Sequence, residues 1–241
     1  MLDLPAKQEQ QVLVRLNDEH QHVYETHLNR ERQKILNLVQ DMDRNRFTIF
    51  QSLTHLRMLA LDPALVDPQL ADISSSKLDA LFENLEDVIS EGHRALVFSQ
   101  FTSFLKVFAQ RLTERGIAFE YLDGSTRHRS QVIEDFKAGT APLFLISLKA
   151  GGFGLNLTEA DYCFLLDPWW NPAVEAQAID RIHRIGQQNR VMVYRLISQG
   201  TIEEKVVALQ ENKRQLISTV MDGADGFAKS LTAQDIRDLL E

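Results

Sequence analysis

The chain has 241 residues, 44% of them hydrophobic and 25% charged, which is the composition of a globular protein of one or two domains. No apolar run approaches the ~20 residues that a membrane-spanning helix needs, and the start of the chain lacks the basic and apolar regions of a signal peptide. The net charge of −8 argues against a simple DNA-coating protein, and the single cysteine, Cys163, excludes an internal disulfide and fits a reducing compartment.

The first 76 residues are predicted to be mainly helical. A short strand is expected at residues 11–16, after which Asn17 or Asp18 caps a long helix. A second helix, from about residue 46, stops at residue 61 because Asp62-Pro63 cannot continue it. Residues 62–76 contain two prolines and three serines, and they are predicted to be a linker that ends in a helix cap.

From residue 77 the pattern changes to strands that alternate with helices. Strands are predicted at residues 94–99, 117–122, 142–147, 161–167 and 191–197. Helices are predicted at residues 77–90, 101–115, 129–137, 174–185 and 202–220, with one more short helix in 230–241. Short apolar strands separated by helices indicate an α/β fold with a parallel sheet covered on both faces. The predicted domains are a helical region at 1–76, an α/β lobe at 77–220 and a C-terminal brace at 221–241.

Three turns follow predicted strands, at the edge where open α/β sheets bind ligands. The first comes directly after Ser99-Gln100. The second, at 121–126 (YLDGST), has a glycine for a sharp turn and two hydroxyls that can bond a phosphate without reading a base. The third, at 147–158 (SLKAGGFGLNLT), has three glycines in four positions, so that backbone N–H groups can approach a phosphate closely.

The run at 177–187, QAIDRIHRIGQ, is the most specific signal. A helix at 174–185 would place Gln177, Arg181 and Arg184 on one face, since they are spaced at i, i+4 and i+7. Two forked guanidinium groups suit a triphosphate whose charge builds during transfer. The plain alternative is an exposed helix in which Asp180 pairs with an arginine. His183 is interpreted as a structural hydrogen-bond partner rather than a proton shuttle.

This run resembles motif VI of the Swi/Snf family of ATP-dependent DNA translocases, in the superfamily-two helicase group. Residues 94–100, 121–126 and 147–158 resemble motifs IV, IVa and V, and DPWWNP at 167–172 resembles the segment before motif VI. Residues 4–25 and 56–66 resemble the segment between the two motor lobes, so the resemblance spans nearly the whole chain. It implies a RecA-like second motor lobe. The turn at 121–126 is shorter than the common eukaryotic pattern, which favours a bacterial source.

The resemblance also implies site residues. Arg181 and Arg184 would be catalytic arginine fingers. ATP would contact Gln177, Asp180, Gly152, Gly154 and Asn156. DNA would contact Ser99, Gln100, Gly124, Ser125, Thr126, Ser147, Lys149 and Trp170. Two adjacent tryptophans between prolines are not expected both to lie in the core, so Trp169 or Trp170 is predicted to pack while the other meets DNA or the partner lobe.

The expected function is that of half a motor. The chain has no Gly-Lys dipeptide and hence no G-x-x-x-x-G-K-[ST] phosphate loop. ATP and Mg²⁺ would therefore be bound mainly by an N-terminal lobe of the same polypeptide, and this chain alone would be inactive. Asp18-Glu19-His20-Gln21 mimics a magnesium box, but a helix cap explains it better and no metal site is expected.

The expected partners are double-stranded DNA, contacted without sequence specificity, the N-terminal lobe, and RNA polymerase or another DNA-bound protein. The chain is expected to be a monomer without membrane contact, located in the cytoplasm at a bacterial nucleoid, or in the nucleus of a eukaryote. Two alternatives stay open, namely the second lobe of an RNA helicase and a non-catalytic scaffold lobe that binds a protein.

Overall fold

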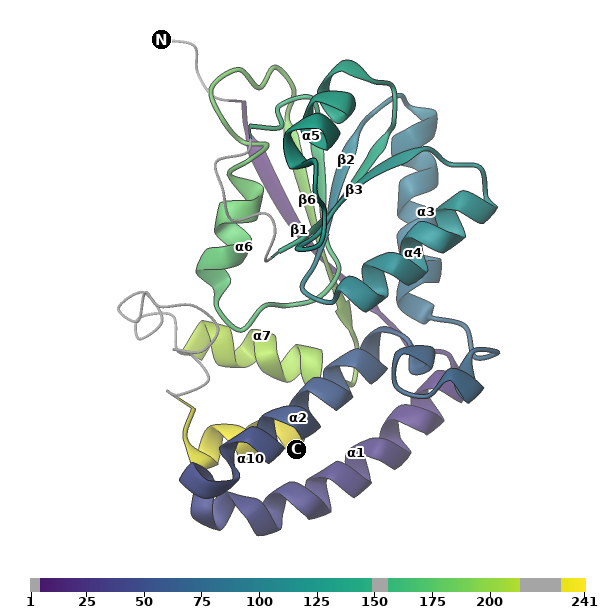
Figure 1. Cartoon of the computed structure of the whole chain (residues 1–241). Coiled ribbons are helices and arrows are strands. Elements are labelled where there is room, and N and C mark those ends of the chain that lie inside the picture. The colour runs from purple at the N-terminus through teal and green to yellow at the C-terminus, as the bar shows by residue number, and fades with distance from the viewer. Residues whose placement is uncertain (1–4, 149–155, 213–230) are drawn as a thin grey trace. The chain divides into compact units, whose positions relative to one another are not determined.

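The computed structural model describes residues 5–148, 156–212 and 231–241 (Figure 1). The described elements group into two compact units. The sheet unit comprises Met1–Val12, Ala80–Asp167 and Ala173–Leu196, and the helical unit comprises Leu13–Asp79, Pro168–Pro172 and Ile197–Glu241. Each unit is built from three separate segments of the chain. The predicted domains at 1–76, 77–220 and 221–241 are instead continuous in sequence. That linear division stays a prediction.

A six-stranded sheet, counted over the described residues, has the order β1-β6-β5-β2-β4-β3. Its strands are β1 (Lys7–Val14), β2 (Ala95–Ser99), β3 (Phe119–Leu122), β4 (Leu143–Ser147), β5 (Tyr162–Leu165) and β6 (Val191–Ser198). The pairs β2·β4, β2·β5, β3·β4 and β5·β6 are parallel. Every residue of β2 and β4 is buried, as expected for central strands covered on both faces.

The first strand differs from its prediction. β1 covers Lys7–Val14 rather than residues 11–16, and most of its side chains are exposed. It pairs only with β6, where Val191 N donates to Ala6 O at 3.1 Å. A strand at the edge of a sheet needs no apolar alternation, because its outer side faces solvent. The polar sequence KQEQ therefore concealed the start of the strand.

Helices cover the sheet, and the predicted α/β class with a RecA-like sheet is confirmed. In Figure 1, α3 (Ser76–Ser90) and α4 (Thr102–Glu114) lie on one side of the strands, and α5 (Arg129–Ala138) and α6 (Pro172–Ile179) lie on the other. Gly116 ends α4 with φ +68, a left-handed conformation that glycine adopts at little cost.

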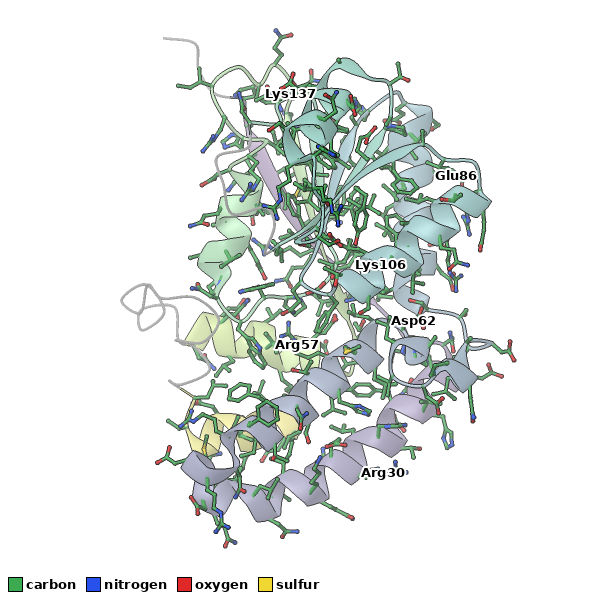
Figure 2. The ribbon with its side chains drawn as sticks, viewed as in Figure 1. Arg30, Arg57, Asp62, Glu86, Lys106 and Lys137 are labelled. Atoms are coloured by element: carbon green, nitrogen blue, oxygen red, sulfur yellow. The ribbon has the colours of Figure 1, made fainter. Side chains whose placement is uncertain are left out.

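The segment predicted to be a linker is ordered within the helical unit. Asp62 and Asp67 each cap a short 3-10 helix, Pro63–Leu65 and Pro68–Leu70 (Figure 2 labels Asp62). Ser75 is fully buried; its Oγ donates to Leu61 O at 2.7 Å and accepts from Leu78 N at 3.2 Å. The predicted helix cap is thus present. The prediction of a linker is wrong, because the side chains of Asp62, Asp67 and Ser75 bond to backbone groups and order this segment.

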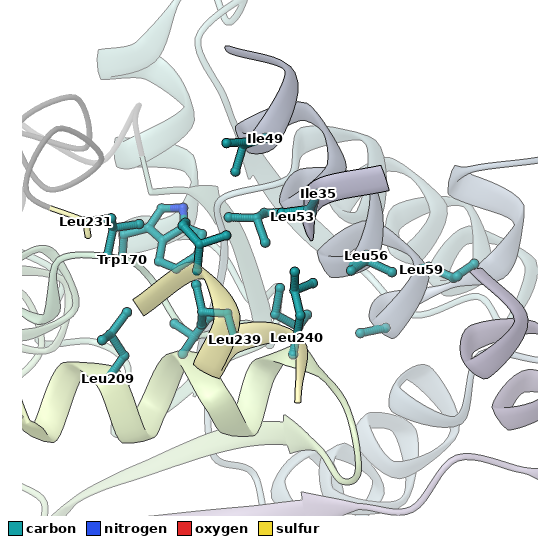
Figure 3. Close-up of a cluster of buried hydrophobic side chains, with 14 of the residues drawn as sticks. Ile35, Ile49, Leu53, Leu56, Leu59, Trp170, Leu209, Leu231, Leu239 and Leu240 are labelled. Carbon is teal, nitrogen blue, oxygen red and sulfur yellow. The ribbon is translucent and has the colours of Figure 1, made fainter. Parts of the chain in front are cut away.

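The helical unit contains α1 (Asp18–Leu38), α2 (Met42–Leu61), α7 (Ile202–Asn212) and α10 (Ala233–Leu240). Asn17, rather than Asp18, caps α1, and its side chain accepts from His20 N at 2.9 Å. α10 is the predicted terminal helix, while the part of helix 202–220 beyond Asn212 lies outside the described residues. One apolar core joins these helices (Figure 3), and its buried members include Ile35, Ile49, Leu53, Leu56, Leu209, Leu239 and Leu240. In the described part of the chain, no helix is long and apolar enough to cross a membrane.

Candidate functional site

The carboxyl ends of the central strands meet at one edge of the sheet. Ser99, the last residue of β2, lies opposite Ser147, the last residue of β4. Leu122 at the end of β3 lies opposite Ile146, and β5 runs parallel on the other side of β2. The turns that follow these strands therefore lie at a common edge, as the sequence predicted for motifs IV, IVa and V.

At this edge the end of β2 is tied to the end of β5. Ser99 is fully buried, and its hydroxyl donates to Asp167 Oδ1. Asp167 Oδ2 accepts from Gln100 N at 3.3 Å, and Ser99 Oγ accepts from Phe101 N at 3.0 Å. Ser147 is also buried. The hydroxyls of Ser99 and Ser147 are therefore internal here, whereas the prediction made them surface donors to DNA; the sequence signal for strand ends did not reveal their burial. Gln100 is half-buried.

The turn after β3 is organised by Asp123, which the sequence reading missed. Asp123 Oδ1 accepts from Ser125 N at 2.8 Å and from Ser125 Oγ at 2.6 Å, and Oδ2 accepts from Tyr121 at 3.0 Å. Burial alone would raise the pKa of Asp123, but the bonds from Ser125 and Tyr121 hold that pKa below its ordinary value. Gly124 and Ser125 are exposed and Thr126 is half-buried, so the turn presents its backbone at the edge. An aspartate one residue before a Gly-Ser pair is the signal that could have found it.

The helix that was expected to carry the arginines ends early, and this prediction is wrong. α6 spans only Pro172–Ile179. Arg181 N bonds to Ala178 O at 3.3 Å and Ile182 N to Ile179 O at 3.1 Å, which are the i→i−3 bonds of a tightening turn. Ile179 and Ile182 are both buried, so the turn is drawn onto the sheet instead of continuing outward as a helix.

Gln177, Arg181 and Arg184 consequently do not share one exposed stripe. Arg181 is buried, with 7% of its surface accessible, while Gln177 and Arg184 are exposed. Burial lowers the pKa of Arg181, and the nearby charge of Arg184 lowers it further. Arg181 Nε and Nη1 have no hydrogen-bond partner among the residues that the structure describes. Buried donors of a cation are unfavourable without an acceptor, so Nε and Nη1 are available for an anion that the described residues do not supply.

Arg181 O accepts from Leu157 N at 3.0 Å, which ties the turn to the end of motif V. Asn156 and Asp180 are exposed. The other predicted motif V contacts, Lys149, Gly152 and Gly154, lie outside the described residues.

Gln187 stabilises the turn that follows α6 and carries Arg181, here called the arginine turn. The sequence did not predict this role. Its Nε2 lies within hydrogen-bond distance of the carbonyls of Thr158 (3.3 Å), Ala160 (2.9 Å) and Ile182 (3.3 Å). Its Oε1 accepts from the backbone N of residues 188 and 189, each at 2.9 Å. His183 Nε2 lies 2.8 Å from Pro5 O, which confirms a structural hydrogen bond for this histidine.

An ion-pair cluster on the sheet unit was also missed. Glu175 of α6 is buried and accepts from Arg195 Nη1 of β6. Arg195 Nη2 lies 3.3 Å from Glu9 Oε2 of β1. The sequence offered one indication of this cluster. Arg195 is the one charged residue in the largely apolar strand β6, where a charged side chain needs an acidic partner.

Both tryptophans are buried, which corrects the prediction that only one could be. Trp169 is 4% and Trp170 8% exposed. Trp170 packs in the core of the helical unit (Figure 3), edge-on to Phe50 with ring centroids 6.4 Å apart. The guanidinium of Arg57, labelled in Figure 2, lies 4.6 Å from the ring centre of Trp170 and donates to Pro168 O. Helices α1, α2 and α10 supply an apolar core that the sequence alone did not place beside this ring, so a DNA contact of Trp170 has no support in its packing.

The acidic box at Asp18–Gln21 is part of helix α1. His20 is fully buried and its Nε2 lies 2.7 Å from Leu59 O. Over the described ranges, no group of three His, Cys, Asp or Glu side chains is placed to hold a metal ion. Burial raises the pKa of the Cys163 thiol to about 12, so this free cysteine stays protonated.

This chain is similar to known helicases and DNA repair proteins. The helicase conserved C-terminal domain matches residues 76–186. The DNA repair protein RAD5 of Cryptococcus neoformans is 46% identical over 172 residues, which are 68% of this chain and 14% of that protein. An uncharacterized ATP-dependent helicase of Mycoplasma pneumoniae is 36% identical over 242 residues, which are 99% of this chain and 23% of that protein. The chain thus spans less than a quarter of either relative.

A solved structure is also similar to this chain. The Sulfolobus solfataricus SWI2/SNF2 ATPase core in complex with dsDNA aligns with a TM-score of 0.77 and 29% identity, covering 100% of this chain and 51% of that one. The predicted bacterial source is not supported, because proteins of similar or higher identity come from a fungus and a plant as well as from a bacterium. Residues 76–186 thus match a helicase C-terminal domain, and the chain is similar in sequence and fold to the C-terminal lobe of Swi/Snf-type ATPases.

Proposed function

We propose that this chain is the second motor lobe of an ATP-dependent translocase on double-stranded DNA. Arg181 and Arg184 would act as arginine fingers on the γ-phosphate of an ATP that a first lobe binds together with Mg²⁺. The observation that carries the proposal is the buried Arg181 side chain, whose Nε and Nη1 have no acceptor in the described part of the chain. A phosphate oxygen would supply that acceptor.

The donor set fits a phosphate. Arg181 is held at the correct end of the sheet by its backbone bond to Leu157, and Arg184 follows it in an exposed turn. Bound ATP would supply the phosphoryl group that is transferred to water. The two guanidinium groups would stabilise the negative charge that develops on it, an effect typically worth ~10³–10⁵ in rate. The exposed side chains of Gln177, Asp180 and Asn156 are the remaining ATP contacts that we propose.

The strand-end turns are proposed to track the DNA backbone. The exposed turn at Gly124-Ser125, together with Gln100 and Thr126, lies where motifs IV and IVa meet. Contacts to phosphate oxygens carry no sequence information, so we expect binding without sequence preference. One neighbouring structure holds dsDNA, and a relative is a DNA repair protein, which supports DNA as the track. A nuclear or nucleoid location, a monomeric state and a DNA-bound protein such as RNA polymerase as a partner remain part of this proposal.

Hydrolysis of ATP by a protein that contains both lobes tests the proposal. Arg181→Ala and Arg184→Ala should each lower DNA-stimulated kcat by at least ~10³-fold, and Arg190→Ala, an exposed arginine of the same segment, is the matched control. The isolated chain should show no hydrolysis. Normal turnover in both finger variants would refute the assignment, as would turnover by the isolated chain. Stimulation by duplex RNA but not duplex DNA would indicate an RNA helicase, and an inactive parent protein with intact arginines would indicate a scaffold.

A further inference from the structure

Helix α6 (Pro172–Ile179) is short and leads into the turn that carries Arg181. It has eight residues, and its buried positions are Glu175, Ala178 and Ile179. Helices this short are marginal in water unless tertiary contacts fix them. Ala178 and Ile179 are aliphatic, whereas Glu175 can make a directional polar contact.

A buried carboxylate needs a partner, and Glu175 has a directional one. It is 2% exposed and accepts a hydrogen bond from Arg195 Nη1. Arg195 lies on β6, opposite Leu165 at the end of β5, so the pair joins α6 to the strand next to the edge strand β1. The second amino group of Arg195 lies 3.3 Å from Glu9 Oε2. A fork held by two carboxylates has little rotational freedom, and the carboxylate of Glu175 is fixed by it.

The orientation of α6 contributes to the position of Arg181. Arg181 follows Glu175 by six residues, with Asp180 N still bonded to Ala176 O at 2.9 Å.

We propose that Glu175 is the positioning residue of one finger, Arg181. Through its bond to Arg195 it fixes the rotation of α6 on the sheet, and thereby the aim of the Arg181 guanidinium. This inference rests on the proposed function and extends it to a residue that touches neither ATP nor DNA. Glu9 is the exposed partner of the same arginine and serves as the matched control, because its loss leaves the buried bond intact.

The test is an epistasis experiment on kcat in the protein that contains both lobes. Glu175→Ala should lower DNA-stimulated kcat by about 100-fold, the loss typical of a catalytic group displaced by about 1 Å, with the KM for ATP nearly unchanged. In an Arg181→Ala background the same substitution should cause no further loss, since the group it positions is already gone. Glu175→Gln keeps an oxygen that can accept from Arg195 and should recover most of the activity. Glu9→Gln should behave as wild type.

Two outcomes would overturn the proposal. One is a loss that multiplies with that of Arg181→Ala, which would make Glu175 a general structural residue. The other is an unchanged kcat in Glu175→Ala with a normal thermal unfolding midpoint. If Glu175→Ala does not fold, the Glu175→Gln variant carries the same comparison. Failure of the proposed function is recognised separately, because Arg181→Ala alone would then retain normal turnover.

Discussion

Replacing Lys77 by methionine should strongly destabilise the helical unit. Lys77 is fully buried and its Nζ pairs with Glu203 Oε2, while Glu203 is 1% exposed. Methionine removes the cation but leaves the carboxylate in the core. Breaking a buried pair in this way costs about 3–5 kcal/mol, because the remaining carboxylate stays buried after it has lost its counter-cation.

Removing both charges should reverse most of that loss. Replacing a whole buried pair with apolar residues is often neutral or stabilising by about 1–4 kcal/mol. Glu203 Oε2 also accepts from Ser198 N at 2.7 Å, and that N–H would lose its acceptor at a cost of about 1–3 kcal/mol. Lys77→Met combined with Glu203→Leu should therefore lie within about 2 kcal/mol of wild type.

Urea unfolding followed by tryptophan fluorescence measures these differences. The two tryptophans of the chain, Trp169 and Trp170, both lie in the helical unit, so the signal reports on the unit that contains the pair. Asp43→Asn removes the exposed partner of Arg46 and is the matched control, expected to leave the midpoint unchanged. A loss below about 1 kcal/mol in Lys77→Met, or a double variant as unstable as the single one, would refute the reasoning.

Three further predictions concern single residues. Trp170→Ala should cost about 3–5 kcal/mol of stability in urea unfolding followed by circular dichroism, and Trp170→Phe much less, because the ring fills the core of the helical unit; equal effects of the two changes would contradict this. Burial holds the pKa of His20 below its ordinary 6.5, so its contribution to stability is complete above pH 6.5 and is lost as the pH falls through the folded pKa. His20→Gln should therefore flatten the pH dependence of the free energy of unfolding below that pH, and an unchanged slope would exclude this histidine as its source. Gln187→Ala should cost about 1–3 kcal/mol, because it leaves buried carbonyls without donors, whereas Gln188→Ala, at an exposed position, should be neutral; similar losses would argue against the proposed clamp.

Much of the sheet could be predicted because its signal is local. The strands β2 and β4 are short apolar runs bounded by polar turns, and only a central parallel strand buries every residue in this way. Parallel order then places Ser99 opposite Ser147, so the meeting of the motif-bearing turns followed from the class of fold. β1 escaped this reasoning because an edge strand has no such pattern.

The details of the site depended on contacts between distant residues. Periodicity continued a helix through Arg181, but the turn is drawn inward by bonds to Leu157 and by Gln187, which reaches Ala160. The burial of Trp170 likewise requires helices from both ends of the chain. No window of sequence around either residue contains those partners.

The sequence by itself determined the class of fold, the segments that form the central strands and the chemical identity of the groups at the edge of the sheet. These follow from local propensity, apolar pattern and side-chain chemistry. Tertiary structure alone decided which of those groups are accessible. It buried Arg181 with no acceptor for Nε and Nη1 among the described residues, exposed Arg184, and joined Glu175 to Arg195. Burial and hydrogen-bond partners are set by residues that are neighbours in space, and the chain brings those together only when it folds.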